Sequence, residues 1–458
     1  MDPFLKFIAA IVAAIVIAIA LARILGYLAS VRRRIVPSLG APLRRLHDVT
    51  SSHEAWEGPD LALALERLAQ REGARKFPFR HADAASIRGV LEGAALTRGG
   101  SSYVVATGPD SVIEVPENVA YVFDRDQPAW CAVLTRVDHH GRPRVWALGT
   151  IASSPDRARW ALDHVVQDAR ARSIYRGKAI TLSASAVESE RFDVQFQPLA
   201  PATRDDIVLP TPVIDVIERN TIRFLEASDR LRDAGRSLRQ GVLLHGVPGV
   251  GKTLVVRWIA SAREGLTAVL LTGRNLRFVR ESLRIAELLA PSVVVFEDVD
   301  LVAGERTSNH AAGVLHELLD ELDGIGPRTP CLVLLTTNRP DVLEPALALR
   351  AGRVDQAVEF PLPDADCRRR LIELAGRGLD LREVSIDRWV VRLDGATPAF
   401  IVELLRRATL MCVERGDRAL APSIAPIDLD RAFDELSATG GSLTRRLFGF
   451  TGATRSPG

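Results

Sequence analysis

The stretch Gly241-Val-Leu-Leu-His-Gly-Val-Pro-Gly-Val-Gly-Lys-Thr253 decides the fold, because it places an apolar strand directly before a glycine-rich turn. The turn satisfies the phosphate-loop pattern G-x-x-x-x-G-K-[ST], and the apolar run after it predicts a helix. Glycines leave backbone N–H groups open to a polyphosphate, Lys252 can reach the outer phosphates, and the Thr253 hydroxyl can ligate Mg²⁺. The residues predicted to hold the phosphates are Gly246, Val247, Pro248, Gly249, Val250, Gly251, Lys252, Thr253 and Leu254.

An ordinary glycine-rich turn is the alternative for this loop alone, and the segments that follow disfavour it. Residues 267–271 and 292–296 are apolar runs typical of buried parallel strands, and the second run ends in Glu297-Asp298-Val299-Asp300. Acids at the carboxyl edge of such a strand lie beside bound phosphates, where one can hold the magnesium shell and the next can orient the attacking water. We therefore assign Mg²⁺ to Thr253 and Glu297, and the water to Asp298.

The usual order of these two acids is Asp followed by Glu, and this chain has the reverse order. The side chain that acts on the water is therefore one methylene shorter, which removes about 1.5 Å of reach. Two consequences stay open: either the loop that carries Asp298 lies closer to the phosphates, or hydrolysis is slow.

A fourth predicted strand at residues 331–335 leads into a longer motif, Thr336-Thr-Asn-Arg-Pro-Asp-Val-Leu-Glu-Pro-Ala-Leu-Ala-Leu-Arg-Ala-Gly-Arg-Val-Asp355. This motif resembles the second region of homology of the AAA ATPases, and the resemblance extends over roughly residues 205–435. It implies ATP and Mg²⁺ as cofactors and Asn338 as the sensor of the γ-phosphate or its water. Arg350 and Arg353 would be fingers that enter the neighbouring subunit's site in a homo-oligomeric ring, hexameric or similar. One extra residue precedes Arg350, so Arg353 is the safer assignment.

The resemblance also implies an aromatic–aliphatic pair that grips protein substrates in the pore of the ring. Phe278 and Val279, in Gly273-Arg-Asn-Leu-Arg-Phe-Val-Arg-Glu-Ser282, are the candidates for this pair. They lie between two arginines, which is unusual for an apolar pair unless it meets a partner. The segment is about two residues shorter than the family's spacing, so the alternative, that Phe278 packs against its own domain, stays open.

An apolar segment near the N-terminus is the second feature that bears on function. Residues 7–22 are apolar without interruption, and residues 24–29 extend the run beyond Arg23. About 20 apolar residues cross the hydrocarbon core of a bilayer. Arginines at 32–34 follow the run, so the positive-inside rule places the N-terminus outside and the rest of the chain in the cytoplasm. We expect a single-pass protein of a bacterial inner membrane; a buried Ala/Ile-rich helix is the alternative.

Charge and cysteine content restrict the class of protein further. The net charge is +2, although six arginines between residues 23 and 45 have no acid among them, so the remainder of the chain is acidic. A protein that acts on nucleic acid is more often basic there, so no nucleic-acid partner is expected. The four cysteines are scattered without C-x-x-C spacing, which predicts reduced cysteines, two of them in apolar runs. The metalloprotease motif H-E-x-x-H is absent from the sequence.

The predicted fold class is a P-loop NTPase α/β parallel sheet with a small α-helical lid, preceded by a β-rich α+β domain and an N-terminal transmembrane helix. The β-rich domain shows no catalytic constellation, and its expected role is partner recognition or docking onto the ring. Thr397 is a predicted helix cap in the lid, with Pro398 at the first helical position. The predicted parts are a transmembrane helix (1–30), a juxtamembrane basic segment and short helix (31–76), the β-rich domain (77–198), a linker (199–212), the large ATPase subdomain (213–364), the lid (365–436) and a flexible tail (437–458).

These observations favour a membrane-anchored AAA ATPase that uses ATP hydrolysis in a ring to remodel, unfold or translocate protein substrates. The order of membrane helix, β-rich region and ATPase domain, with Glu-Asp-Val-Asp after the strand, is similar to a branch of the family, the mitochondrial inner-membrane chaperones that move the folded Rieske protein. Two alternatives stay open: an ATPase that remodels nucleic acid, and a weakly hydrolysing scaffold regulated by nucleotide.

Overall fold

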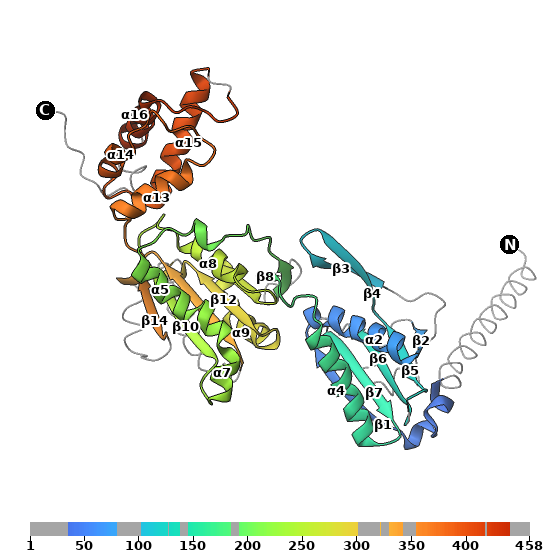
Figure 1. Cartoon of the computed structure of the whole chain (residues 1–458). Coiled ribbons are helices and arrows are strands. Elements are labelled where there is room, and N and C mark those ends of the chain that lie inside the picture. The colour runs from blue at the N-terminus through green and yellow to red at the C-terminus, as the bar shows by residue number, and fades with distance from the viewer. Residues whose placement is uncertain are drawn as a thin grey trace, which may run out of the picture. The chain divides into compact units, whose positions relative to one another are not determined.

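The computed structural model describes residues 35–79, 102–126, 128–137, 145–184, 192–300, 321, 329–341, 354–416 and 419–439 of this chain. The chain forms two compact units, which divide between Ile174 and Tyr175 (Figure 1). Within the described ranges, no helix combines the length and the apolar character that crossing a membrane requires. The predicted span at residues 7–29 lies outside the described residues, and so do Arg350 and Arg353.

The first unit is built on a five-stranded antiparallel sheet in the order β1-β7-β6-β5-β2. Neighbouring side chains on a strand point to opposite faces. Trp130, Ala132 and Leu134 of β6 accordingly join one apolar core, while Cys131 and Val133 join a second core on the other face. The strands are β1 His47–His53, β2 Arg75–Pro78, β5 Val119–Phe123, β6 Trp130–Val137 and β7 Val145–Ala152, and a separate hairpin joins β3 Ser102–Gly108 to β4 Ser111–Pro116.

Two helices cover one face of this sheet, α2 Gly58–Glu72 and α4 Pro155–Ala171, and their apolar side chains pack into the first core. The start of α4 is fixed by sequence, because the Ser154 side chain accepts a hydrogen bond from the Arg157 backbone N–H and Pro155 fits the first turn. The short helices η1 Val36–Leu39 and η2 Leu43–Arg45 cover the opposite face. The central strands β5, β6 and β7 are therefore buried on both faces.

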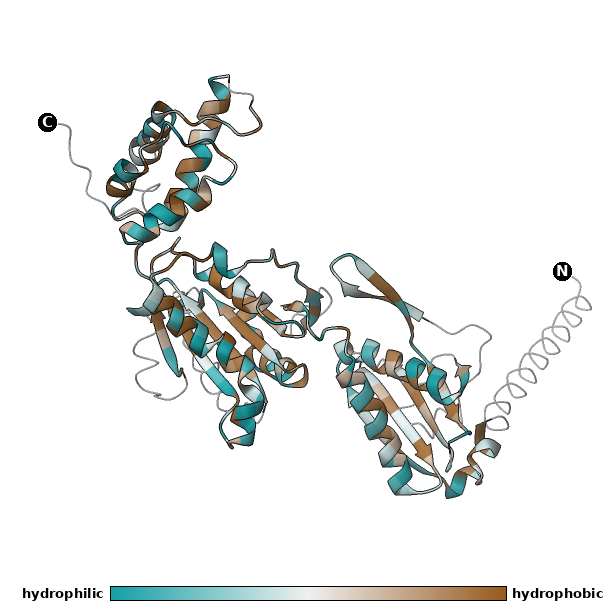
Figure 2. Cartoon of the chain, in the orientation of Figure 1, coloured by the Kyte–Doolittle hydropathy of each residue, from teal (hydrophilic) through white to brown (hydrophobic). Residues whose placement is uncertain are grey.

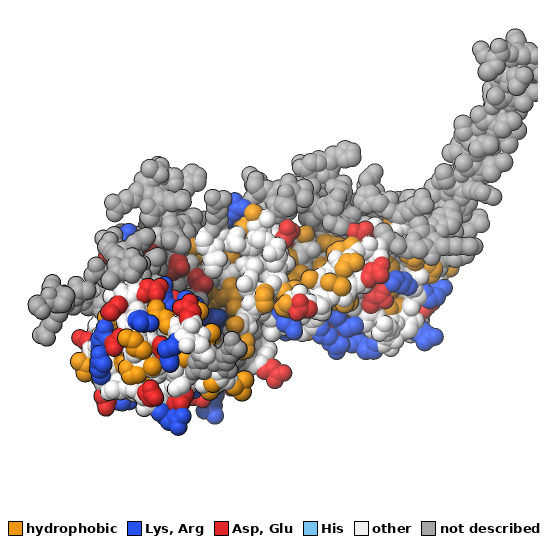
Figure 3. Space-filling model, turned by 90° about the horizontal axis from the view of Figure 1, so that it is seen from above, with side chains coloured by type: hydrophobic (Ala, Val, Ile, Leu, Met, Phe, Trp, Pro, Cys, Tyr) orange, Lys and Arg blue, Asp and Glu red, His pale blue; other side chains and the backbone are white. Residues whose placement is uncertain are grey.

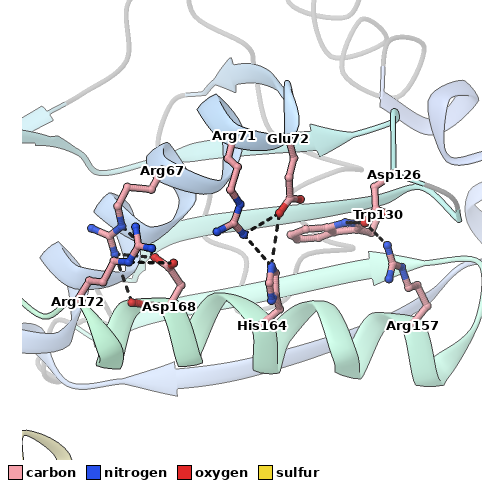
Figure 4. A network of polar contacts seen from close by, with 9 residues as sticks. All are labelled: Arg67, Arg71, Glu72, Asp126, Trp130, Arg157, His164, Asp168 and Arg172. Atoms are coloured by element: carbon pink, nitrogen blue, oxygen red, sulfur yellow. Dashed lines mark hydrogen bonds and ion pairs between the residues drawn. The ribbon is translucent and has the colours of Figure 1, made fainter.

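Polar contacts join α2 to α4 above the sheet, as Figure 4 shows. Arg67 of α2 donates from Nε to Asp168 of α4 at 2.9 Å, and Glu72 of α2 lies 3.5 Å from His164 of α4. Each ion pair at a partly exposed position contributes at most about 1 kcal/mol. The packing of the two helices thus depends mainly on the apolar core beneath them.

The second unit contains a seven-stranded sheet in the order β14-β10-β13-β12-β11-β8-β9. All neighbouring strands are parallel except β9, which pairs antiparallel with β8. Strands buried on both faces read as continuous apolar runs, and Figure 2 shows hydrophobic residues along the central strands. The strands are β8 Ala179–Ala184, β9 Phe192–Phe196, β10 Arg239–His245, β11 Thr267–Thr272, β12 Ser292–Glu297, β13 Cys331–Thr337 and β14 Gln356–Glu359. The predicted parallel sheet is confirmed.

The boundary between the two units differs from the one predicted at residue 198. Strands β8 and β9 were expected in the β-rich domain, yet β8 pairs with β11 through Ala179↔Ala268 and extends the sheet of the second unit. The segment before β8 also contacts the second unit. The Arg176 guanidinium donates to the carbonyl oxygen of Ala290 and to that of Leu288, the latter at 3.1 Å. Backbone pairing of this kind joins distant residues, so it leaves no local signal in the sequence.

Helices flank the sheet and then form a separate layer at the end of the chain. Next to the sheet are α5 Thr211–Asn220, α6 Ile222–Glu226, α7 Ser228–Asp233, α8 Lys252–Ser261, η5 Gly273–Phe278 and α9 Val279–Leu288. The lid consists of α13 Ala365–Ala375, α14 Ile386–Arg392, α15 Pro398–Glu414 and α16 Pro426–Asp434, followed by a π-helical turn, Glu435–Thr439. The predicted cap at Thr397 is confirmed, since its side chain accepts a hydrogen bond from the Phe400 backbone N–H.

The lid has its own apolar core, in which Phe400, Leu404 and Trp389 are buried. Ion pairs occupy its surface, for example Arg406 with Glu403 at 2.7 Å. In the view of Figure 3, acidic and basic side chains are mixed on the part of the described surface at lower left, whereas basic side chains gather along the lower edge at right. The cysteines of both units are buried and free, as the sequence predicts for reduced thiols.

Candidate nucleotide-binding site

The turn between β10 and α8 is where the sequence predicts a phosphate-binding loop. Gly246, Gly249 and Gly251 have positive φ angles of 151°, 84° and 100°, which side chains disfavour. A Cβ atom at Gly246 would lie 2.7 Å from the Phe360 carbonyl oxygen. Glycine is therefore required at this position by space as well as by backbone angle.

The loop also contacts the lid through Gly249. The Ala399 backbone N–H, in the first turn of α15, donates to the Gly249 carbonyl oxygen at 3.1 Å. A Cβ atom at Gly249 would lie 3.0 Å from the Ala399 Cβ and 3.2 Å from the Thr397 Oγ1. The close approach of lid and loop leaves no room for a side chain here.

Lys252 lies at the centre of the site. Its buried ammonium donates to the carbonyl oxygens of Gly246, at 2.7 Å, and Val247, at 3.2 Å, and to Asn338 Oδ1 at 2.8 Å. Burial lowers the pKa of Lys252, whereas the charges of Asp298 and Asp300 oppose this shift. A cation held between the loop and two acids is suited to bind phosphate oxygens.

Glu297 ends strand β12 beside the first turn of α8. Burial raises the pKa of Glu297, while a hydrogen bond with the Thr253 side chain acts in the opposite direction. Glu297 Oε1 is buried and has no hydrogen-bond partner among the described residues. A hydroxyl and a carboxylate are the oxygen ligands that Mg²⁺ prefers, and one or two protein ligands suffice when phosphates complete the shell. Thr253 and Glu297 therefore fit the predicted metal.

Asp298 follows in a left-handed backbone conformation, with φ of 50°, which Asp tolerates better than most residues. Its backbone N–H donates to the Thr336 hydroxyl at 2.9 Å, and its Oδ1 accepts from Asn338 Nδ2 at 2.9 Å. The Asn338 side chain thus bridges Lys252 and Asp298. The carboxyl ends of β10, β12 and β13 bring these three residues together, as the strand-end argument predicts.

The pore residues lie elsewhere, and the structure contradicts their predicted exposure. Phe278 is 5% exposed and Val279 is 1% exposed, at the junction of η5 and α9. The Phe278 ring packs against Phe192 of β9, with ring centroids 5.7 Å apart, and the Arg277 guanidinium lies 4.7 Å from the ring centroid. The alternative that Phe278 belongs to the core of its own unit is the one that the structure favours.

This burial predicts a loss of stability when Phe278 is replaced. Phe278→Ala should lower the free energy of unfolding by about 3 to 5 kcal/mol, because it removes a buried ring and leaves a cavity. Urea denaturation of the full chain, followed by circular dichroism, measures this change. Val391→Ala is the control, since Val391 is 75% exposed and its replacement should change stability by no more than about 0.5 kcal/mol. Equal stability of the two variants would show that Phe278 is not a core residue.

The sequence that carries the loop, the lysine, the acids and the asparagine matches a known protein family. Residues 242–362 match the family model described as "ATPase family associated with various cellular activities (AAA)". These residues form an AAA ATPase domain. The match contains most of strand β10 and strands β11 to β14, and with them Lys252, Glu297, Asp298 and Asn338.

Several curated proteins are similar to the AAA domain and its surroundings. The human "ATPase family gene 2 protein homolog A" is 36% identical over 195 residues, which are 39% of this chain and 22% of that protein. The "ATP-dependent zinc metalloprotease FtsH 2" of Sphaerobacter thermophilus is 32% identical over 268 residues, or 55% of this chain and 40% of that protein. The "26S proteasome regulatory subunit 4 homolog" of Oryza sativa subsp. japonica is 34% identical over 197 residues, or 40% and 44%. The chain spans less than half the length of these three relatives.

Proposed function

We propose that this protein is a membrane-anchored AAA ATPase that hydrolyses ATP in a homo-oligomeric ring and uses the energy to remodel, unfold or translocate protein substrates. The observation that carries the ATPase proposal is the convergence of Lys252, Glu297, Asp298 and Asn338 at one edge of the sheet. The names of the metalloprotease and proteasome relatives support a protein substrate. The apolar run at residues 7–29 and the arginines after it support the anchor.

Each residue of the site has a defined task in this reaction. In this reaction water would attack the terminal phosphate of bound MgATP and break the terminal phosphoanhydride bond. Lys252 and the loop N–H groups bind the phosphate oxygens, and Thr253 and Glu297 would hold the magnesium shell. Asp298 orients the attacking water and accepts its proton, and Asn338 fixes the direction of Asp298 through the 2.9 Å hydrogen bond. Leu254 and Val250 belong to the loop–helix junction that places these groups.

The competing function is a scaffold that is regulated by nucleotide and hydrolyses it only weakly. The position of Asp298 helps to decide between this function and an active ATPase. The short Asp in place of Glu could reduce hydrolysis, but the positive φ at Asp298 changes the direction in which this side chain leaves the strand. The carboxylate lies within hydrogen-bonding distance of Asn338, which itself contacts Lys252. This geometry favours an active hydrolase over a scaffold. Phosphate release by the full chain in detergent separates the two functions.

Dependence on a ring is tested with Arg353, which we propose as the finger supplied to the neighbouring site. Arg353→Ala should bind ATP as the wild type does and hydrolyse it at least about 1,000-fold more slowly, because the transition-state charge loses its partner. Mixing this variant with Lys252→Ala subunits should restore part of the turnover, since a junction between the two types contains one complete site. Arg159→Ala, an exposed arginine of α4, is the control. Full activity of a monodisperse monomer would refute the requirement for a ring.

A further inference from the structure

Asp300 is an acid of the site to which the phosphate-loop argument gives no task. It lies two residues beyond Asp298 and is only 7% exposed. Its Oδ1 accepts two hydrogen bonds from the end of strand β13, one from the Thr337 hydroxyl at 2.8 Å and one from the Asn338 backbone N–H at 3.1 Å. A buried carboxylate is costly unless donors compensate it, so these two contacts fix Asp300 and the strand end to each other.

The Thr337 hydroxyl extends this connection by one residue. It donates to Asp300 and accepts from the Arg339 backbone N–H at 2.9 Å. Directly before it, the Thr336 hydroxyl accepts from the Asp298 backbone N–H at 2.9 Å. The turn after β12 and the end of β13 are therefore joined by hydrogen bonds at Thr336, at Thr337 and at the Asn338 backbone.

We propose that Asp300 is a positioning residue for hydrolysis: through the Asn338 backbone it sets the place of the Asn338 amide group between Lys252 and Asp298. This inference rests on the proposed ATPase function. The Asn338 side chain makes contacts of 2.8 Å to Lys252 and 2.9 Å to Asp298 at the same time, which leaves little tolerance for movement of its backbone. A displacement of about 1 Å in a reacting group can reduce the rate about 100-fold.

Replacement of Asp300 in the full chain tests this proposal. Asp300→Ala removes the acceptor and should lower kcat about 30- to 100-fold, while the affinity for ATP stays within about 3-fold because the phosphate loop is unchanged. Asp300→Asn keeps an Oδ1 acceptor for both donors and should recover most of the lost rate. If Asp300→Asn is as slow as Asp300→Ala, the charge of Asp300 is what matters and the positioning proposal is overturned.

Hydrogen exchange gives a readout that does not depend on hydrolysis. Asp300→Ala should speed amide exchange in the peptide that covers residues 331–341, because the Asn338 N–H loses its acceptor; Asp300→Asn should not. Unchanged exchange in Asp300→Ala overturns the proposal even when kcat falls. A wild type that releases no phosphate would refute the proposed ATPase function. The difference in amide exchange between Asp300→Ala and Asp300→Asn would still show whether Asp300 holds the Asn338 backbone.

Thr337 supplies a second pair of variants in case Asp300→Ala does not fold. Thr337→Val keeps the shape of the side chain and removes the hydroxyl that links Asp300 to Arg339, so kcat should fall several-fold with little change in ATP affinity. Thr337→Ser keeps the hydroxyl and should hydrolyse faster than Thr337→Val. Equal rates for these two variants would contradict the proposed connection.

Discussion

Lys252→Ala is expected to weaken ATP binding by at least about 100-fold, equivalent to about 2.7 kcal/mol. The ammonium of Lys252 is buried between the phosphate loop and Asn338, where each hydrogen bond from a charged donor contributes about 1.5 to 3 kcal/mol. Alanine removes the positive charge that faces the phosphates and leaves the Gly246 carbonyl oxygen without this donor. Titration of the full chain with a fluorescent ATP analogue measures the change in affinity.

Lys76→Ala is the matched control for this experiment. Lys76 forms an ion pair with Glu66 at the surface of the first unit, and the side chains of both residues are partly exposed. Such a pair contributes at most about 1 kcal/mol to stability. The Lys76→Ala variant should therefore stay folded and bind ATP with the affinity of the wild type. Binding by Lys252→Ala within about 3-fold of wild type would refute the assignment of Lys252 to the phosphates.

Asp298→Asn is expected to have the second large effect, a loss of hydrolysis of at least about 100-fold with ATP affinity preserved. An asparagine has nearly the same shape, and its Oδ1 can still accept from Asn338 Nδ2, so the local geometry is kept. Its amide cannot accept the proton of the attacking water. Phosphate release at saturating ATP, measured beside equilibrium binding, separates the two steps.

Glu297→Gln distinguishes the tasks of the two neighbouring acids. Glu297 contacts the Thr253 side chain, so its replacement should raise the Mg²⁺ concentration required for half-maximal turnover. Asp298→Asn should leave this concentration unchanged. Normal turnover in Asp298→Asn together with its loss in Glu297→Gln would show that the two roles are reversed.

The same Asp298→Asn variant offers a way to identify substrates. If the protein acts as the proposed ring and releases its substrates on ATP hydrolysis, this variant should bind ATP and retain the proteins on which it acts. Proteins that co-purify with Asp298→Asn, but not with Lys252→Ala, are then the candidates.

The sequence was informative where chemistry depends on the end of a strand. Four residues of the site come after apolar runs that form parallel strands, and parallel strands place their carboxyl ends at one edge of the sheet. These residues are Lys252, Glu297, Asp298 and Asn338. The structure brings all four together. Arg353 and the membrane span stay predictions, because both lie outside the described residues.

Two features escaped prediction because they depend on contacts between distant segments. Strand β8 joins the AAA sheet by backbone pairing with β11, and the proline-rich segment after β9 suggested a domain boundary that the fold does not have. Phe278 was expected to grip substrate in the pore because its segment resembles the family's pore segment and because arginines flank it. In the structure, Phe192 from β9 packs on its ring and Arg277 lies beside it, so a correct prediction required β9 to be placed first.

The hydrogen bond between Ala399 and Gly249 has a consequence for the timing of the reaction cycle. The first turn of α15 holds the backbone of the phosphate loop, so the lid cannot swing outward without pulling on that loop. A lid movement in the proposed ATPase cycle would therefore have to break this hydrogen bond or shift the loop that binds the phosphates. A residue larger than glycine at position 249 would meet Ala399 and Thr397, so it should push the first turn of α15 away from the loop and speed the release of nucleotide.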